Sequence, residues 1–201
     1  MEEFLEWEQC YQDGNTPWDR GEPAPMLRQL LARTPEAFQG RILVPGCGTG
    51  HDARLLAGAG ARVVAADIAP SALARARELD LSNQVDWREM NLFAMPAEFL
   101  GAFDTVWEHT CLSALEPDQR TAYAAALKSA LKSGGSIRGV FFIHPDMDPG
   151  ESGPPFAISE EDVKALWTSV GLEIVDSWVP DVAYEGREGR ELYLHARLPG
   201  A

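Results

Sequence analysis

Three glycines that follow a predicted strand remove the side chains that would keep a ligand away from the backbone. The strand expected at 41–44 is followed by Gly46, Gly48 and Gly50, and a predicted helix comes next. Because glycine has no Cβ, this loop can approach a bound group closely. The next predicted strand ends at Asp67, about twenty residues further on, where a carboxylate can accept hydrogen bonds from two ribose hydroxyls. The pattern indicates a cofactor that contains a nucleoside.

The spacing of the glycines separates the possible cofactors. The dinucleotide fingerprint is GxGxxG, and His51 stands where its last glycine would be. A phosphate loop of the form GxxxxGK[ST] is also absent from the sequence. The GxGxG loop followed by an acid resembles class I S-adenosylmethionine-dependent methyltransferases. This resemblance implies S-adenosyl-L-methionine as cofactor and S-adenosyl-L-homocysteine as product, with a nicotinamide oxidoreductase as the less favoured alternative.

Further candidates for cofactor contacts follow in the expected order. After the predicted strand at 85–88, the side chain of Asn91 can face an adenine amino group and Leu92 can cover the ring. Asn91 can equally cap the turn that follows it. The remaining candidates for this site are Cys47, inside the glycine loop, and Ile68, next to Asp67.

A longer set of motifs resembles one family, the thiopurine and thiol/halide S-methyltransferases. The motifs are WEQCY at 7–11, GNTPWDRGEPAP at 14–25, LVPGCG at 43–48, FDTVWEHT at 103–110, ALEP at 114–117 and GPPF at 153–156. Together they extend over nearly the whole chain. The resemblance implies methyl transfer to a small soft nucleophile, with residues 1–40 as an N-terminal lid extension.

By this resemblance, Trp18 covers the methyl end of the cofactor and shields it from water. An aromatic face beside a cationic sulfonium is also electrostatically favourable. The alternative is ordinary packing of Trp18 onto the domain. The same resemblance places Glu108 beside the cofactor and the reacting groups, as a candidate for both cofactor binding and catalysis.

His109 marks a departure from the family pattern. Many thiol/halide members carry Asp-Tyr-Thr after the fourth strand, and this chain has Glu108-His109-Thr110. With an ordinary pKa near 6.5, His109 can accept a thiol proton, or it can simply form the pocket wall. Arg187 can pair with an acidic acceptor or with the cofactor carboxylate. The candidates for the acceptor pocket are thus Trp18, His109, Thr110, Pro155, Phe156 and Arg187.

The favoured acceptor is a thiol or hydrosulfide. Transfer from a sulfonium is a direct displacement, so alignment and exclusion of water matter more than strong acid or base groups. Four alternatives stay open: an aromatic thiopurine-like thiol, a halide, a chalcogen oxyanion, and a protein that binds S-adenosylmethionine without turnover.

The elements that must position these residues alternate along the chain. Short β-branched or aromatic runs predict strands at 41–44, 62–66, 85–88, 103–107, 137–142, 172–178 and 191–197, and helical segments are expected at 52–59, 71–79, 118–131 and 159–170. This alternation is typical of an α/β, Rossmann-like, seven-stranded and mostly parallel sheet with helices on both faces. The last strand is expected to be antiparallel, because 179–190 is too short for a parallel crossover.

Composition limits the class of protein. With 201 residues and 45% hydrophobic content, the chain is expected to form a single domain over 1–201. A net charge of -14 disfavours nucleic-acid partners. Three widely spaced cysteines suit neither a disulfide framework nor a metal site. An acidic N-terminus and the absence of a long apolar run predict a cytoplasmic protein that does not bind membranes. We expect a monomer or weak homodimer with a small-molecule substrate.

Overall fold

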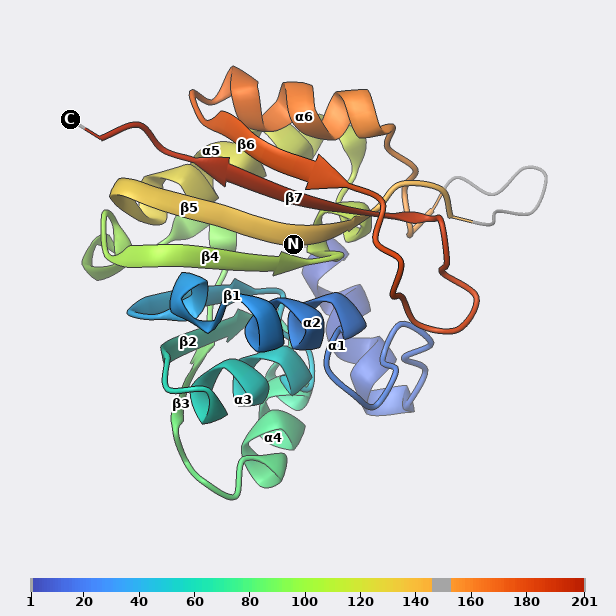
Figure 1. Ribbon diagram of the computed structural model, residues 1–201. Coiled ribbons are helices and arrows are strands. Elements are labelled where there is room, and N and C mark those ends of the chain that lie inside the picture. The colour runs from blue at the N-terminus through green and yellow to red at the C-terminus, as the bar shows by residue number, and fades with distance from the viewer. Residues whose placement is uncertain (1, 146–152, 201) are drawn as a thin grey trace.

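The computed structural model describes residues 2–145 and 153–200, and a seven-stranded sheet forms its centre (Figure 1). The strands are β1 (Arg41–Pro45), β2 (Arg62–Asp67), β3 (Val85–Glu89), β4 (Phe103–His109), β5 (Leu131–Phe142), β6 (Glu173–Trp178) and β7 (Glu191–Arg197). Their order is β3-β2-β1-β4-β5-β7-β6, and β7 is antiparallel to both of its neighbours. The predicted sheet and its antiparallel last strand are confirmed.

Helices cover both faces of this sheet. They are α1 (Glu2–Asp13), α2 (Pro25–Arg33), α3 (His51–Gly58), α4 (Pro70–Leu79), α5 (Arg120–Ala130) and α6 (Glu160–Ser169). Apolar residues of α2, α3 and α4 share one core with the sheet, and those of α5 and α6 share the other. Helices α1 and α2 lie within residues 1–40, where the sequence pattern predicts a lid extension but no helix. Among the described residues, no helix combines the length and apolar character needed to cross a bilayer.

Successive side chains of the central strands contribute alternately to the two cores. Leu43 and Val64 pack on the α5 and α6 side, whereas Ile42, Val44 and Val63 pack on the opposite side. Successive side chains of a strand point to opposite faces, so a strand buried on both faces is apolar throughout. This is why β1 and β2 read as unbroken apolar runs.

The boundary between α5 and β5 differs from the prediction. The sequence predicts a helix over 118–131 and a strand that begins at 137, but the helix ends at Ala130 and β5 already includes residues 131–136. A Cβ on Gly135 would lie 2.9 Å from the Lys132 carbonyl oxygen, and the pairing with β4 shifts register nearby. The glycine pair therefore permits an irregularity inside a strand, where close backbone approach requires glycine.

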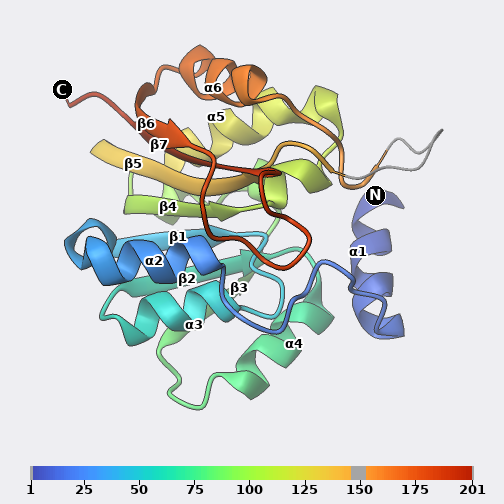
Figure 2. The same ribbon diagram turned by 45° about the vertical axis from the view of Figure 1, so that its right-hand side comes forward.

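The carboxyl ends of the parallel strands meet the N-terminal segment. Helix α1 and the chain leading to α2 lie beyond these strand ends, as does the loop between β6 and β7 (Figures 1 and 2). The chain leaves β1 toward α3 on one face, and it leaves the neighbouring β4 toward α5 on the other. Such a switch point opens a crevice at the carboxyl ends of an open α/β sheet.

Candidate active site

A cavity of about 630 Å³ occupies this edge of the sheet. Its volume lies within the range of small-molecule sites. The wall comes from the N-terminal segment, the ends of β1, β2 and β4, and the loops near 154 and 184. The site candidates that line it are Trp18, Gly46, Cys47, Gly48, Asp67, Ile68, Asn91, Leu92, His109, Thr110, Pro155 and Arg187.

The carboxylate of Asp67 is held in place by two backbone groups. The Gly48 N–H donates to Asp67 Oδ2 at 2.7 Å, and the Ala69 N–H donates to Oδ1 at 2.9 Å. Burial raises the pKa of Asp67, and these hydrogen bonds act in the opposite direction. Each oxygen can still accept a further hydrogen bond, so the carboxylate is oriented to receive hydroxyl groups.

Unlike Gly46 and Gly48, Gly50 does not border the cavity, and its role as a cofactor contact stays a prediction. A Cβ at this position would lie 2.2 Å from the Trp87 ring, and the backbone φ is +78°. Its absent side chain therefore makes room for Trp87 of β3. Gly48 borders the cavity, but a Cβ there would lie 2.8 Å from the Tyr11 hydroxyl of the N-terminal segment.

The position of Asn91 is compatible with both expected roles, capping of the following turn and contact with adenine. Its side-chain oxygen accepts a hydrogen bond from the Phe93 N–H at 2.9 Å and caps the short helix η2 (Leu92–Ala94). Asn91 and Leu92 also line the cavity. Capping is therefore present in the structure, whereas contact with adenine stays a prediction.

Glu108 and Phe156 lie outside the cavity wall, contrary to expectation. The Glu108 side chain is fully buried in the core, where Oε1 accepts from the Leu112 N–H at 2.6 Å and from the Tyr123 hydroxyl at 3.3 Å. Burial raises the pKa of Glu108 to about 7. Phe156 is also buried, against Gly153. Along a strand, successive side chains alternate between faces, so His109 borders the cavity and Glu108 does not.

His109 is paired with an acid for which the sequence pattern predicts no role at the site. Its Nδ1 lies 2.9 Å from Asp52 Oδ2, and Asp52 also accepts from the Trp107 indole N–H and the Ala24 N–H, both at 2.7 Å. Among the described residues, His109 Nε2 is buried without a hydrogen-bond partner. Burial alone lowers the pKa of His109, but Asp52 more than offsets this and holds it above 6.5. Asp52 escaped notice because an acid in the first turn of a helix is common.

Arg187 lines the cavity with its charge already paired. Its guanidinium lies 3.4 Å from the Glu191 carboxylate, and both side chains are buried. The same guanidinium lies over the ring of Phe142, 4.8 Å from the centroid, and near the ring of Tyr184. Arg187 is therefore part of an aromatic and ionic wall.

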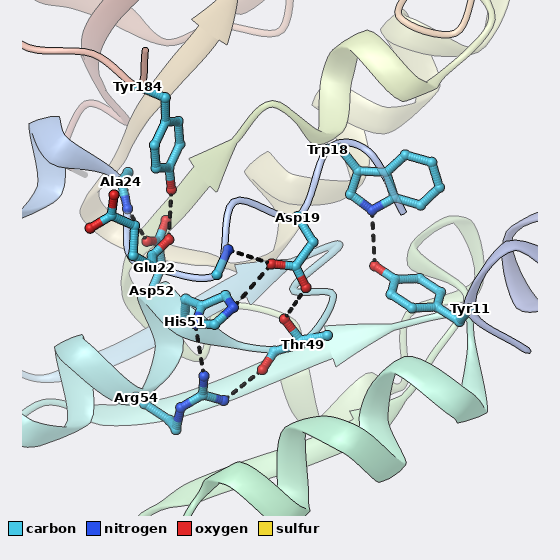
Figure 3. A network of polar contacts seen from close by, with 11 residues as sticks. Tyr11, Trp18, Asp19, Glu22, Ala24, Thr49, His51, Asp52, Arg54 and Tyr184 are labelled. Carbon is cyan, nitrogen blue, oxygen red and sulfur yellow. Dashed lines mark hydrogen bonds and ion pairs between the residues drawn. The ribbon is translucent and has the colours of Figure 1, made fainter. Parts of the chain in front are cut away.

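The N-terminal segment is fastened to the glycine loop by Asp19 (Figure 3). The Thr49 hydroxyl donates to Asp19 Oδ2 at 2.6 Å, and His51 Nε2 lies 3.1 Å from Oδ1. The Arg54 guanidinium can only donate to His51 Nδ1, so in the neutral imidazole Nε2 carries the hydrogen and donates to Asp19. The hydrogen bond from His51 lowers the pKa of Asp19 well below its usual range.

Trp18 belongs to an aromatic cluster at the same edge. Its indole N–H donates to the Tyr11 hydroxyl at 3.2 Å, and its ring meets Trp7 edge-on with centroids 5.2 Å apart. Further along the segment, the Tyr184 hydroxyl donates to the Glu22 carbonyl at 2.7 Å (Figure 3). The segment between α1 and α2 is thus attached both to the glycine loop and to the opposite wall of the cavity.

A match over most of the chain decides the family. The sequence model described as thiopurine S-methyltransferase matches residues 3–191. The chain belongs to the thiopurine S-methyltransferase family. The chain is 31% identical over 190 residues to probable thiol methyltransferase 2 of Arabidopsis thaliana. This match covers 92% of the chain and 81% of the relative. The chain is also 30% identical over 197 residues to thiocyanate methyltransferase 1 of Brassica oleracea, with the same two coverages.

A bacterial relative and a solved structure agree with this placement. The chain is 27% identical over 176 residues to a thiopurine S-methyltransferase of Xanthomonas campestris pv. campestris (strain 8004), and the match covers 80% of each chain. Its fold matches 1,6-didemethyltoxoflavin-N1-methyltransferase of Burkholderia thailandensis with a TM-score of 0.73 and 21% identity, over 98% of this chain and 87% of that one. The nicotinamide alternative is therefore wrong.

The protein is an S-adenosylmethionine-dependent methyltransferase, and its cavity fits that cofactor. The fit rests on the oriented Asp67 carboxylate, on the loop where Gly46 and Gly48 border the cavity, and on Asn91 and Leu92, which line it as well. When bound, the cofactor supplies an electrophilic methyl group on a sulfonium centre.

Proposed function

We propose that this methyltransferase transfers the methyl group to a small thiol or hydrosulfide that binds beside His109. One observation carries the proposal: the buried Nε2 of His109 has no hydrogen-bond partner among the described residues, and His109 lines the cavity. A sulfur acceptor reacts as its anion, so a nitrogen placed to share or hold its proton favours the reactive form. The printed names of the relatives, which concern thiols, thiocyanate and thiopurines, support a sulfur acceptor.

The composition of the acceptor wall favours a small, soft group. Apolar wall residues around His109 include Phe142, Pro154 and Pro155. Within the described part of the chain, the lysines and arginines that line the cavity are Arg20 and Arg187, and Arg187 is paired with Glu191. A phosphorylated acceptor would need several free cationic donors. We therefore place thiols and hydrosulfide ahead of larger charged acceptors.

The cavity cysteines are not needed as nucleophiles. Cys47 and Cys111 line the cavity, and burial raises the pKa of each thiol, which keeps them protonated. A direct displacement also requires no covalent intermediate with the enzyme. All three cysteines are free thiols, which supports the proposal of a cytoplasmic, reducing compartment.

Residues 1–40 are proposed to act as the lid of a single methyltransferase domain. Trp18 and Asp19 border the cavity, and the contacts of Asp19 with the glycine loop support closure over a bound cofactor. A closed lid would exclude water from the methyl group and hold the acceptor in line with it.

Headspace gas chromatography tests the proposal. The purified protein is incubated with S-adenosylmethionine and either hydrosulfide or methanethiol, beside the variants Asp67→Ala and His109→Gln. We expect methanethiol or dimethyl sulfide from the wild type and much less from both variants. Absence of volatile product, together with confirmed binding of S-adenosylhomocysteine, would refute the small-thiol acceptor and direct attention to thiopurine-like thiols. Absence of binding as well would refute the cofactor site.

A further inference from the structure

Charged groups surround the His109 imidazole from several elements. Asp52 of α3 contacts Nδ1, and the buried Glu191 of β7 acts on the ring through its charge. The positive charge of Arg187 lowers the pKa of the imidazole, whereas the two acids raise it. Glu108 is the adjacent acid on β4. Tyr184 stacks on the ring with centroids 5.9 Å apart, and burial raises its pKa, so it adds no charge at neutral pH.

These charges pair in a definite way. Arg187 and Glu191 form an ion pair, which leaves the buried Asp52 carboxylate to be balanced by His109. Glu108 is fully buried, and the raised pKa of its carboxyl group makes its negative charge incomplete at neutral pH. A buried charge without a counter-charge strongly destabilises the folded state. The protonated imidazole is therefore the state that balances Asp52.

The hydrogen bonds of Asp52 fix how the imidazole is presented. Ala24 donates to Oδ1, while Trp107 and His109 share Oδ2, so the carboxylate cannot turn without losing a partner. Nδ1 of His109 must carry a hydrogen to contact this acceptor. The second ring nitrogen, Nε2, is left without a partner in a residue that lines the cavity.

We propose that Asp52 is a positioning residue that keeps His109 as an imidazolium, and that the Nε2–H of this imidazolium holds the methyl acceptor as an anion. The inference rests on the proposed function and specifies the form of its acceptor: a thiolate, hydrosulfide or similar soft anion. A charged N–H donor and an anionic sulfur form a stronger hydrogen bond than two neutral groups. The pair also keeps the anion compensated while it is desolvated.

The protons balance for both kinds of acceptor. An acceptor that arrives as an anion binds directly to the imidazolium. A neutral thiol meets the fraction of His109 that is unprotonated, its S–H bond breaks, and the proton moves to Nε2 to give the same pair. The acceptor sulfur then forms the new S–CH₃ bond as the sulfonium C–S bond breaks and leaves its electron pair on the cofactor sulfur. With a neutral thiol, the proton taken up at Nε2 leaves to solvent after the product departs, whereas with an anionic acceptor the imidazolium keeps its proton throughout.

Titration of the imidazole tests the role of Asp52 without requiring turnover. Nitrogen-15 spectra of the histidine-labelled full-length chain are recorded from pH 5 to 10, and His109→Gln identifies the signals of His109. We expect the wild-type midpoint above 6.5 and a shift of at least one unit downward in Asp52→Asn. Asp80→Asn is the matched control, because Asp80 is also buried and accepts from an indole, that of Trp87. It should leave the midpoint unchanged.

Two results would overturn the proposal: a wild-type midpoint at or below 6.5, or the same midpoint in Asp52→Asn as in the wild type. If Asp52→Asn does not fold, a second measurement on the wild type decides. Thiocyanate is titrated into the complex with S-adenosylhomocysteine while the Nε2 signal of His109 is followed. Its affinity should fall about tenfold per pH unit above the midpoint, and constant affinity up to pH 9 would refute anion holding. If the titration midpoints and the pH dependence of thiocyanate affinity are as expected but no thiol is methylated, the proposed function is refuted and the roles of Asp52 and His109 are not.

Discussion

The backbone N–H of Gly48 donates to the Asp67 carboxylate at 2.7 Å, which joins the glycine loop after β1 to the end of β2. Neither group could reach the other unless the two strands were adjacent and parallel, as β1 and β2 are. The contact fixes the orientation of the carboxylate before a ligand binds, so less ordering is required on binding.

Asp67→Ala should weaken S-adenosylhomocysteine binding by about 1–3 kcal/mol, because buried ribose hydroxyls would lose a charged acceptor. Isothermal titration calorimetry measures this change directly. Asp86→Ala is the control, since Asp86 lies on the adjacent β3 but is exposed and paired with Arg88. Equal affinity of the Asp67 variant and the wild type would remove Asp67 from the cofactor site.

Gly50→Ala should destabilise the protein by about 2–4 kcal/mol, because a Cβ there would collide with Trp87 at a positive φ. Gly58→Ala is the control at the opposite end of α3, the helix that Gly50 precedes: a Cβ at Gly58 meets no atom within 4 Å, so this variant should be neutral or stabilised by up to about 1 kcal/mol. Urea unfolding at pH 7.5 compares the two variants. Similar stabilities for both would contradict the packing role of Gly50.

Asp19→Ala should detach the N-terminal segment from the glycine loop. We expect tryptic cleavage after Arg20 to accelerate roughly tenfold, equivalent to about 1.4 kcal/mol. Glu22→Ala is the control, because the Glu22–Arg28 pair is exposed and the Tyr184 contact uses the backbone of Glu22. If Glu22→Ala accelerates cleavage as much, Asp19 does not hold the segment.

The contribution of Asp19 should also depend on pH. Its pKa is lower in the folded protein than in the unfolded chain, so the unfolded state binds the proton first as pH falls. The stabilisation is therefore complete above about pH 4 and is lost as pH falls through the folded value. Urea unfolding of the wild type and Asp19→Ala between pH 3 and 7 should show a constant difference in stability above about pH 4, and this difference should begin to shrink by about pH 3.

Glu108→Gln should stabilise the protein at alkaline pH. The folded pKa is about 7, above the ordinary value of 4.5, so the wild type loses stability as pH rises through this interval. The difference amounts to about 2–4 kcal/mol above pH 8, and Gln can still accept from Leu112 and Tyr123. Glu98→Gln, at an exposed position, should show no such trend. Unfolding curves at pH 5 and 8.5 provide the check, and an unchanged difference between the two pH values would contradict it.

Local pattern was sufficient for most of the fold. Apolar runs and their spacing predicted all seven strands, and the helix predicted from residue 159 is present as α6, whose first turn is capped by the Ser159 side chain accepting from the Asp162 N–H. The boundary at Ala130 was missed because two consecutive glycines are typical of helix ends and also of irregular strands. Which of these occurs depends on the pairing of β5 with β4, a contact distant in sequence.

The family, the α/β sheet and the candidate residues for the cofactor could be predicted from local patterns, because glycines, the acid at Asp67 and strand periodicity act over short distances along the chain. The acid that accompanies His109 could not be predicted in this way, because it depends on long-range packing. Glu108 is its neighbour in sequence but points into the core, whereas Asp52, fifty-seven residues earlier, contacts its ring. Alternation along β4 separates adjacent side chains, and packing of α3 against the sheet brings the distant acid to the imidazole.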